Sequence, residues 1–513
     1  MHLTKPHVIL IYPKTGLDFG STVAPPHACL AVAAPLDKAG YRVAILDQRT
    51  QVINEQALAE LISDDLIFVG LSSMTGTQIK HALKISGMVR SLTNGSVPIV
   101  WGGTHPTILP EQTVSHPNVD IVVMGEGELT IMELIKALEN KQPLSGILGL
   151  CYMDGPLVML NATRPLMDVE ELLPVPWHLI PVEKYIHRDM YVKNSVRTLD
   201  IGQTSRGCPF RCGFCSSASI RGRKWRAMSA EKSLDMIVSS VRKFNLDGLW
   251  LRDDEFYINR ARAHTIFEGM IRENLNVSFY TSGTRVDVFL QASDEELLAM
   301  KNAGAYTLKF GAESGSQRIL DLMQKGITPE MTLKVNQKCK KLGIIPSFGL
   351  VIGYPTETFE DIDMTIDLAY RLKRENPDAQ LETMAQFTPL PGTPSWDLAV
   401  KHGLVSPASL DGWCNWLFDD YDFAGEKLPW YNARERQWIG NISYMSILAN
   451  ALNNVVDSMR NNTLRRIFKV LARPASAYFR FRLRNKFYRF APEMAIVRYL
   501  RRKIFYESEA TIE

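Results

Sequence analysis

The 513-residue sequence contains few cysteines and no long apolar segment. Seven cysteines are too few for a disulfide-dense secreted scaffold, and their odd number argues against complete pairing. No apolar run reaches the roughly 18 residues of a membrane-spanning helix. The N-terminus also lacks the charged and then apolar segments of a secretory signal peptide. These absences predict a cytoplasmic protein.

Low-complexity sequence is absent as well. Hydrophobic residues make up 46% of the chain and charged residues 22%, close to globular averages. The length exceeds the roughly 150 residues of an average domain, so we expect two or three domains.

The formal net charge of +3 conceals an asymmetry. Residues 460–503 contain 14 Lys or Arg and one acidic residue, Glu493. The rest of the chain carries 44 basic and 54 acidic residues. A basic C-terminal segment therefore follows an acidic body.

Residues 1–145 alternate short apolar runs with amphipathic segments of helical length, which is the pattern of a parallel sheet with crossover helices. The expected strands are Val8–Tyr12, Arg42–Asp47, Leu66–Ser72, Pro98–Gly102 and Asp120–Met124. The expected helices are His27–Ala39, Gln56–Ser63, Thr77–Leu92 and Glu128–Glu139. We predict a five-stranded, doubly wound, Rossmann-like domain.

Four of these strands are followed by candidate ligand-binding segments, and three of the four segments are rich in Gly, Ser or Thr. Such sheets bind ligands outside the carboxyl ends of their strands. The segments are Pro13–Gly16, Ser72–Gly76, Gly102–Pro106 and Gly125–Glu128. One loop of this composition is ordinary, but several at one edge of a sheet favour a binding site.

A proline-rich connector is expected at residues 146–196, with four prolines between Pro165 and Pro181. The βα alternation resumes at Ile201. The next expected strands are Gly248–Arg252, Val277–Ser282, Thr307–Gly311, Pro346–Ile352 and Gln380–Phe387. We predict a barrel-like α/β domain over residues 197–400 and a mostly helical region over residues 401–513. The fold class is α/β.

Three of the seven cysteines, Cys208, Cys212 and Cys215, lie within eight residues. Thiolates at this spacing can reach three corners of a cuboidal iron–sulfur cluster. A structural zinc site is the alternative interpretation of these cysteines, because Cys-x2-Cys also occurs in such sites. Zinc would need a fourth ligand, yet no histidine lies between His187 and His264. An open fourth position suits a [4Fe-4S] cluster with one iron free to chelate a substrate.

The Cys-x3-Cys-x2-Cys spacing, with the aromatic Phe214 before the last cysteine, resembles the signature of the radical S-adenosylmethionine (SAM) superfamily. With the N-terminal domain and its loops, the chain resembles the cobalamin-binding subfamily over about residues 5–400. The resemblance implies a [4Fe-4S] cluster held by Cys208, Cys212 and Cys215, SAM bound at its open iron, and cobalamin.

The resemblance also implies binding residues for two of these cofactors. For SAM they are Phe214, Ser282, Arg285, Glu313 and Gly353. For cobalamin they are Ser72, Ser73, Thr75, Gly76, Gly102, Gly103, Thr104, His105, Gly125, Glu126 and Gly127. An ordinary strand end is an equal alternative at Ser282 and Arg285. It is a weaker one at Glu313, because acids at the carboxyl ends of barrel strands are commonly catalytic.

The sequence departs from one pattern of cobalamin-binding proteins, the motif that supplies a histidine ligand to cobalt. Cobalamin proteins that donate a histidine to cobalt usually carry Asp-x-His-x-x-Gly after the first strand, and this sequence lacks that string. The nearest comparable segment, Asp47–Thr50, ends the second expected strand. We infer that cobalamin is held without a histidine below cobalt, as in the radical SAM methylases that the chain resembles. His27 and His105 are expected to be solvated loop residues.

The leading functional interpretation is C-methylation of an unactivated carbon. In the mechanism that the resemblance implies, SAM cleavage yields a 5'-deoxyadenosyl radical that abstracts a substrate hydrogen, and methylcobalamin supplies the methyl group. Ring closure of the anaerobic Mg-protoporphyrin monomethyl ester cyclase type stays open, as does a non-catalytic zinc-binding adaptor. The expected partners are a small molecule, with lipids and porphyrins considered, and a flavodoxin- or ferredoxin-like electron donor. No catalytic residue is assigned.

Aromatic and basic residues alternate in the C-terminal segment. Three interpretations stay open: a helical cap on the barrel with Arg outward, an interfacial helix on anionic lipid, and a nucleic-acid surface. The third is the weakest. Sulfur-inserting tRNA enzymes with this cysteine spacing carry another cysteine trio in their N-terminal domain, and only Cys29 and Cys151 precede Cys208 here.

We predict that replacing Cys212 with Ala removes the cluster, because two thiolates cannot hold it in place. Iron should fall from about four atoms per chain towards zero, and 5'-deoxyadenosine release should stop. Replacing any of Cys29, Cys151, Cys339 or Cys414 singly should preserve the iron. Iron analysis after anaerobic purification is the measurement, and a full iron complement in Cys212→Ala would refute the assignment.

Overall fold

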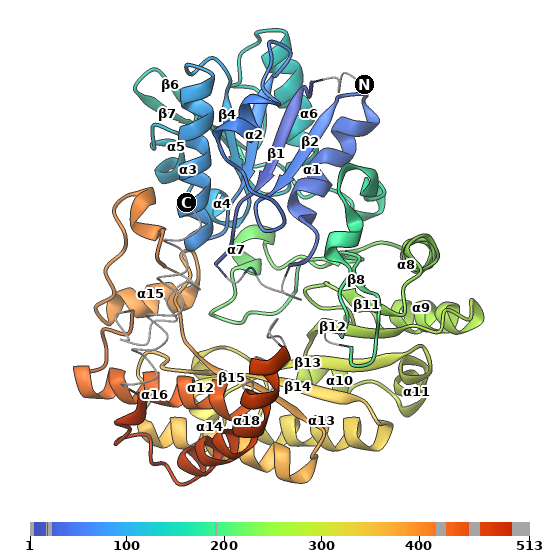
Figure 1. The fold of residues 1–513 in the computed structure, drawn as a ribbon, viewed down its shortest axis with the longest axis vertical. Helices are drawn as coiled ribbons and strands as arrows, with labels where there is room; N and C mark the ends of the chain where they lie inside the picture. Colours follow the sequence, from blue (N-terminus) through green and yellow to red (C-terminus); the bar gives the residue numbers. More distant parts are fainter. Residues whose placement is uncertain are drawn as a thin grey trace. The chain divides into compact units, whose positions relative to one another are not determined.

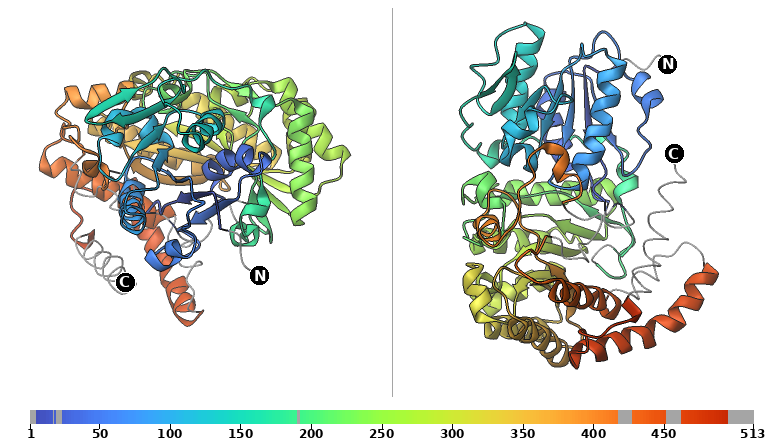
Figure 2. Two further views of the ribbon diagram at one scale, coloured as in Figure 1. Left: turned by 90° about the horizontal axis from the view of Figure 1, so that it is seen from above. Right: turned by 90° about the vertical axis from the view of Figure 1, so that its left-hand side faces the viewer.

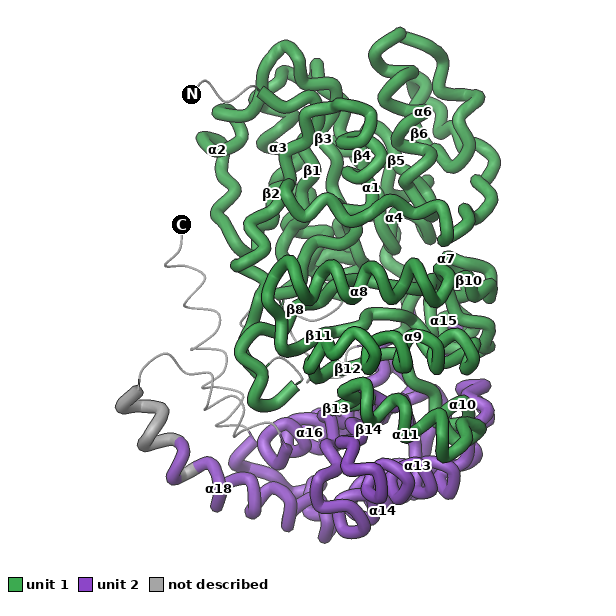
Figure 3. Tube along the Cα trace, turned by 90° about the vertical axis from the view of Figure 1, so that its right-hand side faces the viewer, with its two compact units in different colours: residues 1–308, 389–397, 405–421 green, residues 309–388, 398–404, 422–513 purple. Residues whose placement is uncertain are grey.

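The computed structural model describes residues 5–16, 18, 23–189, 192–416, 427–450 and 462–494. The chain forms two compact units, which Figure 3 shows in green and purple. Residues 1–308, 389–397 and 405–421 make up the first unit. Residues 309–388, 398–404 and 422–513 make up the second.

The first unit opens with a seven-stranded sheet in the order β2-β1-β3-β4-β5-β6-β7 (Figure 1). Its parallel strands are β1 (Val8–Tyr12), β2 (Val43–Asp47), β3 (Phe68–Ser72), β4 (Ile99–Gly102) and β5 (Ile121–Val123). The five predicted strands and the Rossmann-like fold are confirmed. The order reverses direction between β1 and β3, and ligands of such sheets bind beside that point.

The predicted number of strands was two too low. β6 (Leu150–Asp154) pairs antiparallel with β5 and, through a two-residue turn, with β7 (Leu157–Leu160). Both strands lie within residues 146–196, where we expected only a connector. β7 is an edge strand, and most of its side chains are exposed to solvent. Leu157, for example, is 64% exposed. Such a strand lacks the buried apolar pattern by which the others were predicted.

Helices cover both faces of this sheet (Figures 1 and 2). α1 (His27–Lys38) packs against α6 (Gly127–Glu139), and α2 (Glu55–Ala59) lies beside α3 (Thr77–Leu92). Two short helices follow β4 and were not predicted, α4 (Thr104–Ile108) and α5 (Pro110–Val114).

The rest of the first unit contains the first barrel strands. β8 (Thr198–Asp200), β11 (Gly248–Leu251) and β12 (Ser278–Thr284) are parallel, with β11 between the other two. β8 lies within the predicted barrel domain of residues 197–400 but was not among the predicted strands. A short antiparallel ribbon of β9 (Ser205–Arg206) and β10 (Arg226–Ala227) brackets the cysteine segment and α7 (Ser217–Arg221). The helices are α8 (Ala230–Phe244), α9 (Arg260–Arg272), α10 (Val286–Leu290) and α11 (Asp294–Asn302).

The chain passes into the second unit within β13 (Ala305–Glu313). There β14 (Ile345–Ile352) and β15 (Gln380–Gln386) pair in parallel. The helices between these strands are α12 (Gln317–Leu322), α13 (Pro329–Leu342) and α14 (Phe359–Glu375). Helix α15 (Pro394–Lys401) follows, and α16 (Ala433–Asn450) and the long α18 (Asn462–Arg484) close the described chain.

The described part of the basic segment packs onto the second unit as a cap. Tyr488 is fully buried, its ring stacks on Phe359, and its hydroxyl lies 3.0 Å from Asp363 Oδ1. Arg482 is buried and paired with Glu493, whereas the cap interpretation expected every arginine to face outward. The remaining basic and aromatic residues after 494, such as Tyr499 and Arg501, lie outside the described residues.

None of the helices in the described ranges combines the length and apolarity needed to cross a membrane.

Candidate functional site

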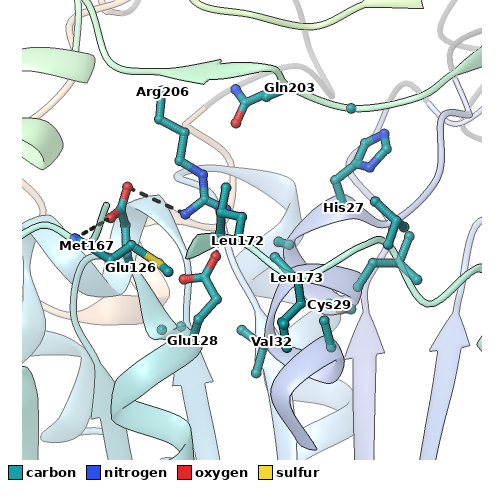
Figure 4. Close-up of a pocket in the computed structure, with 18 of the residues that line it drawn as sticks. His27, Cys29, Val32, Glu126, Glu128, Met167, Leu172, Leu173, Gln203 and Arg206 are labelled. Atoms are coloured by element: carbon teal, nitrogen blue, oxygen red, sulfur yellow. Dashed lines mark hydrogen bonds and ion pairs between the residues drawn. The ribbon is translucent and has the colours of Figure 1, made fainter. Parts of the chain in front are cut away.

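A cavity of about 1160 Å³ lies in the first unit, at the carboxyl ends of the parallel strands (Figure 4). One wall comes from the sheet and from helices α1 and α6. The facing wall comes from the residues that follow β8 and β11, from the cysteine segment and α7, and from helix α8. The cavity therefore meets both of the regions to which the sequence assigned cofactors.

The three clustered cysteines lie in the segment between β9 and α7, and Cys215 lines the cavity. Gly207 gives this segment its turn: its φ is +85°, and a Cβ there would lie 2.1 Å from the Lys224 carbonyl oxygen. The Gly207 N–H donates to Asp254 Oδ2 at 3.0 Å. Among the described residues, no three His, Cys, Asp or Glu side chains converge on a single ion, whereas a cluster is held by thiolates on separate irons.

Of the SAM candidates in the first unit, Arg285 contacts the cysteine segment. Its Nη1 lies 3.1 Å from Cys212 Sγ, and its guanidinium carbon lies 3.7 Å from the centre of the Phe210 ring. Asp287 accepts from Arg285 Nε at 2.9 Å. Phe214 stands between Cys212 and Cys215, and Ser282 Oγ lies 3.4 Å from Trp250 Nε1 on the neighbouring strand.

The other two SAM candidates belong to the second unit. Glu313 ends β13 with a φ of +58°, and its Oε1 is 2.7 Å from Lys325 Nζ. Gly353 follows β14 with a φ of +86° and donates its N–H to Glu357 Oε2 at 2.5 Å. Burial raises the pKa of Glu357 to about 8.

Seven of the eleven cobalamin candidates line the cavity. They are Ser72, Gly102, Gly103, Thr104, Gly125, Glu126 and Gly127. The other four, Ser73, Thr75, Gly76 and His105, are buried and are absent from the cavity wall. Gly125 has a φ of +74°, and no atom lies within 4 Å of where its Cβ would be, so it leaves open space for a ligand.

Both histidine expectations were wrong. His105 is fully buried, its Nδ1 lies 3.1 Å from Thr75 Oγ1, and its ring packs against Trp413. Burial lowers the pKa of His105 to about 4, so it is neutral at pH 7. His27 begins helix α1, lines the cavity and is bonded to the buried Asp200.

Gly103 is required by the local backbone, whether or not it also contacts a ligand. Its φ is +105°, and a Cβ there would lie 2.6 Å from the Ser73 carbonyl oxygen. The Ser73 N–H donates to Gly102 O at 2.8 Å, and the His105 N–H donates to Ser73 O at 3.2 Å. These bonds join the loops after β3 and β4. Ser73 and His105 therefore support the cavity-lining residues Gly102 and Gly103 without lining the cavity themselves.

Two arginines that sequence reasoning missed connect the sheet loops to the ribbon around the cysteines. Arg226 Nη2 lies 2.6 Å from Glu126 Oε1, and Arg206 Nη2 lies 2.6 Å from Glu128 Oε1. Burial raises the pKa of Glu126, but the Arg226 hydrogen bond and the charges of Arg206, Arg226 and Arg221 outweigh it and lower the pKa. Because Glu126 is ionised and paired, it holds structure at the cavity wall.

The chain matches two families: the radical SAM superfamily over residues 203–369 and the B12 binding domain over residues 21–135. An uncharacterized methyltransferase of Pyrococcus horikoshii is 33% identical over 78% of this chain and 84% of that protein. The anaerobic magnesium-protoporphyrin IX monomethyl ester cyclase of Rubrivivax gelatinosus is 29% identical over 75% of this chain and 68% of that protein.

A solved structure of the cobalamin-dependent radical SAM enzyme OxsB, with aqua-cobalamin and SAM bound, has the same fold. Its TM-score is 0.72 at 21% identity, over 94% of this chain and 72% of that chain. The chain belongs to the cobalamin-binding radical SAM enzymes. Its cofactors are accordingly a [4Fe-4S] cluster, SAM and cobalamin.

The cavity fits cobalamin. Besides the open space at Gly125, it runs along the face of the sheet under helices α1 and α6, where its lining is largely apolar. That lining includes Leu10, Phe68, Gly70 and Val100. A cavity of this volume, with apolar residues along the sheet and polar residues at the strand ends, suits a large macrocycle that carries polar side groups.

We predict that Gly103→Ala weakens cobalamin binding by about tenfold or more, because the new Cβ displaces the Ser73 loop and the positive φ adds strain of about 1–3 kcal/mol. Gly155→Ala is the matched control: the φ of Gly155 is +58°, and no atom lies within 4 Å of its would-be Cβ. Equilibrium dialysis of hydroxocobalamin against the full chain measures both. Equal affinity of Gly103→Ala and Gly155→Ala would contradict this account.

Proposed function

We propose that this enzyme methylates an unactivated carbon of a small molecule, with the methyl group passing from SAM by way of cobalamin. The supporting observation is that one cavity borders both Cys215 and the cobalamin candidate loops. A radical formed beside the cluster and a methyl donor held on the sheet loops would thus share one substrate chamber. The relative described as an uncharacterized methyltransferase supports methyl transfer as the reaction type.

In this proposal Cys208, Cys212 and Cys215 hold the cluster, whose role when bound is to cleave SAM reductively. Arg285 contacts Cys212 and so lies where it can bind SAM beside the cluster. Phe214 and Ser282 stay SAM candidates in the first unit. Glu313 and Gly353 stay candidates on the family resemblance alone, since each is already bonded to a neighbour.

For cobalamin, we propose that the seven candidates lining the cavity contact the cofactor. Ser73, Thr75, Gly76 and His105 would act by positioning the loops. We also propose that no histidine binds cobalt from below. His105 is absent from the cavity wall, and the ring of His27 is held by Asp200 on the barrel side.

Ring closure is the alternative reaction, and the cyclase relative supports it. The two reactions differ in what becomes of SAM. Methylation converts one SAM to S-adenosylhomocysteine as its methyl group leaves and a second to 5'-deoxyadenosine, whereas ring closure through the radical needs no methyl group. A flavodoxin- or ferredoxin-like protein is the proposed source of electrons.

We expect the reconstituted holoenzyme, given SAM with a deuterated methyl group and an active substrate, to place that label on a carbon atom. S-adenosylhomocysteine and 5'-deoxyadenosine should form in about equal amounts, because each turnover uses one SAM for each purpose. Mass spectrometry of product and nucleosides is the measurement. An unlabelled product formed with 5'-deoxyadenosine alone would favour ring closure.

We further propose that the C-terminal cap rests on anionic lipid. Phe481, Phe487 and Phe490 are 55%, 54% and 80% exposed, and the exposed Arg480 and Arg484 stand beside them. Basic residues near an anionic surface contribute about 1 kcal/mol each, and aromatic rings insert at the interface. This contact would give access to lipid or porphyrin-like substrates.

Triple replacement of Phe481, Phe487 and Phe490 by Ser should reduce flotation with anionic liposomes, because the inserted rings are lost while the fold keeps Tyr488. The matched control is Val405→Ser, which removes an apolar side chain that is 82% exposed elsewhere. Flotation should also weaken as salt rises. If the full chain fails to float with anionic vesicles, the lipid proposal is wrong.

A further inference from the structure

A second polar site lies on the barrel side of the cavity, centred on Asp200 at the end of β8. The Asp200 carboxylate is fully buried and accepts from the Gly202 N–H at 2.9 Å, from His27 Nε2 at 3.0 Å and from Arg252 Nε. Burial acts to raise the pKa of Asp200, but the charges of His27 and Arg252 lower it to about 2. Asp200 is therefore ionised at neutral pH and fixes both neighbours.

Arg252 is held on two sides and keeps one edge open. Its guanidinium carbon lies 3.8 Å from the centre of the Trp250 ring, and its Nε bonds to Asp200. Within the described ranges, no acceptor is bonded to its Nη1 or Nη2, and the side chain is 36% exposed at the cavity wall. A guanidinium held this way can offer two parallel N–H groups, which match the two oxygens of a carboxylate or phosphate.

The other arginines of the cavity wall already have carboxylate partners. Arg206 is paired with Glu128 and Arg221 with Asp254, at 2.6 Å in each case. Arg252 differs, because its only carboxylate partner among the described residues, Asp200, bonds to Nε and leaves Nη1 and Nη2 available. It is therefore the arginine of this wall best prepared to receive an anion.

His27 extends the site from the start of α1. Since an ionised carboxylate can only accept, His27 Nε2 carries the hydrogen that faces Asp200. Gly202 leaves room for the ring, because a Cβ there would lie 3.3 Å from it. Figure 4 shows His27 and Gln203 at the cavity, and both line it. The positive end of the α1 backbone dipole lies at this first turn and also favours an anion. The first turn contains no acidic residue that would offset it.

We propose that Arg252, positioned by Asp200 and accompanied by His27, binds a carboxylate or phosphate group of the substrate. The inference rests on the proposed function and narrows its substrate to an acid with an apolar skeleton, since most of the cavity lining is apolar. The same oxyanion chemistry could come from the cobalamin phosphate or the SAM carboxylate. The experiment must therefore separate these sources.

Inorganic phosphate is the probe, titrated into holoprotein that contains the cluster and saturating hydroxocobalamin and SAM. The readout is the ring-nitrogen NMR signal of His27 in protein labelled with nitrogen-15 histidine, assigned by its loss in His27→Gln. We expect a saturable shift. In Arg252→Lys, which keeps a cation beside Asp200 but loses the two-donor edge, the dissociation constant should rise about tenfold.

Arg242→Gln is the matched control: it removes an arginine that is 61% exposed on α8 and paired with Glu273, and it should not change phosphate binding. Retained cobalamin binding shows that Arg252→Lys is folded. The proposal fails if phosphate gives no saturable shift, if Arg252→Lys binds it equally well, or if the shift is seen only without cobalamin or only without SAM. Because no turnover is measured, this result is independent of whether the enzyme transfers a methyl group.

Discussion

The half-buried ion pairs between the residues after β5 and the β9–β10 ribbon are the contacts on which the site depends. Glu126 and Glu128 follow β5, and Arg206 and Arg226 flank the cysteine segment. Removing one partner of such a pair leaves the other charge mostly withdrawn from water and without a counter-charge, which destabilises the site. The pairs therefore fix the distance between the segment that would hold the cluster and the loops that would hold cobalamin.

The same cavity combines a largely apolar lining with ion pairs at its wall, such as those of Arg206 with Glu128 and of Arg221 with Asp254. Apolar lining excludes water, which protects a radical from side reactions and strengthens any electrostatic contact that remains. In that setting Asp200 positions both Arg252 and His27. It bonds to Arg252 Nε and leaves the two terminal nitrogens of the guanidinium available to a ligand. Substrate selection and radical chemistry would then use neighbouring parts of one chamber.

The candidate site was only partly predictable from sequence. Loop composition pointed to the edge of the sheet at which the cavity lies, because the carboxyl ends of parallel strands meet there. It could not separate cavity-lining residues such as Gly125 from the supporting layer of Ser73, Thr75 and His105. That separation depends on which side of each loop faces the sheet, and a backbone contact such as that between Gly103 and Ser73 leaves no trace in composition.

By itself, the sequence determined the βα alternation, the cysteine triplet and the family, because periodic burial and ligand spacing are local properties of the chain. Only the tertiary structure decided that Asp200, His27 and Arg252 meet, that Arg226 joins Glu126, and that Tyr488 of the C-terminal cap is buried against Phe359. Each of these contacts joins residues far apart in the chain. Their pairing follows from how the strands and helices pack, and no local pattern encodes it.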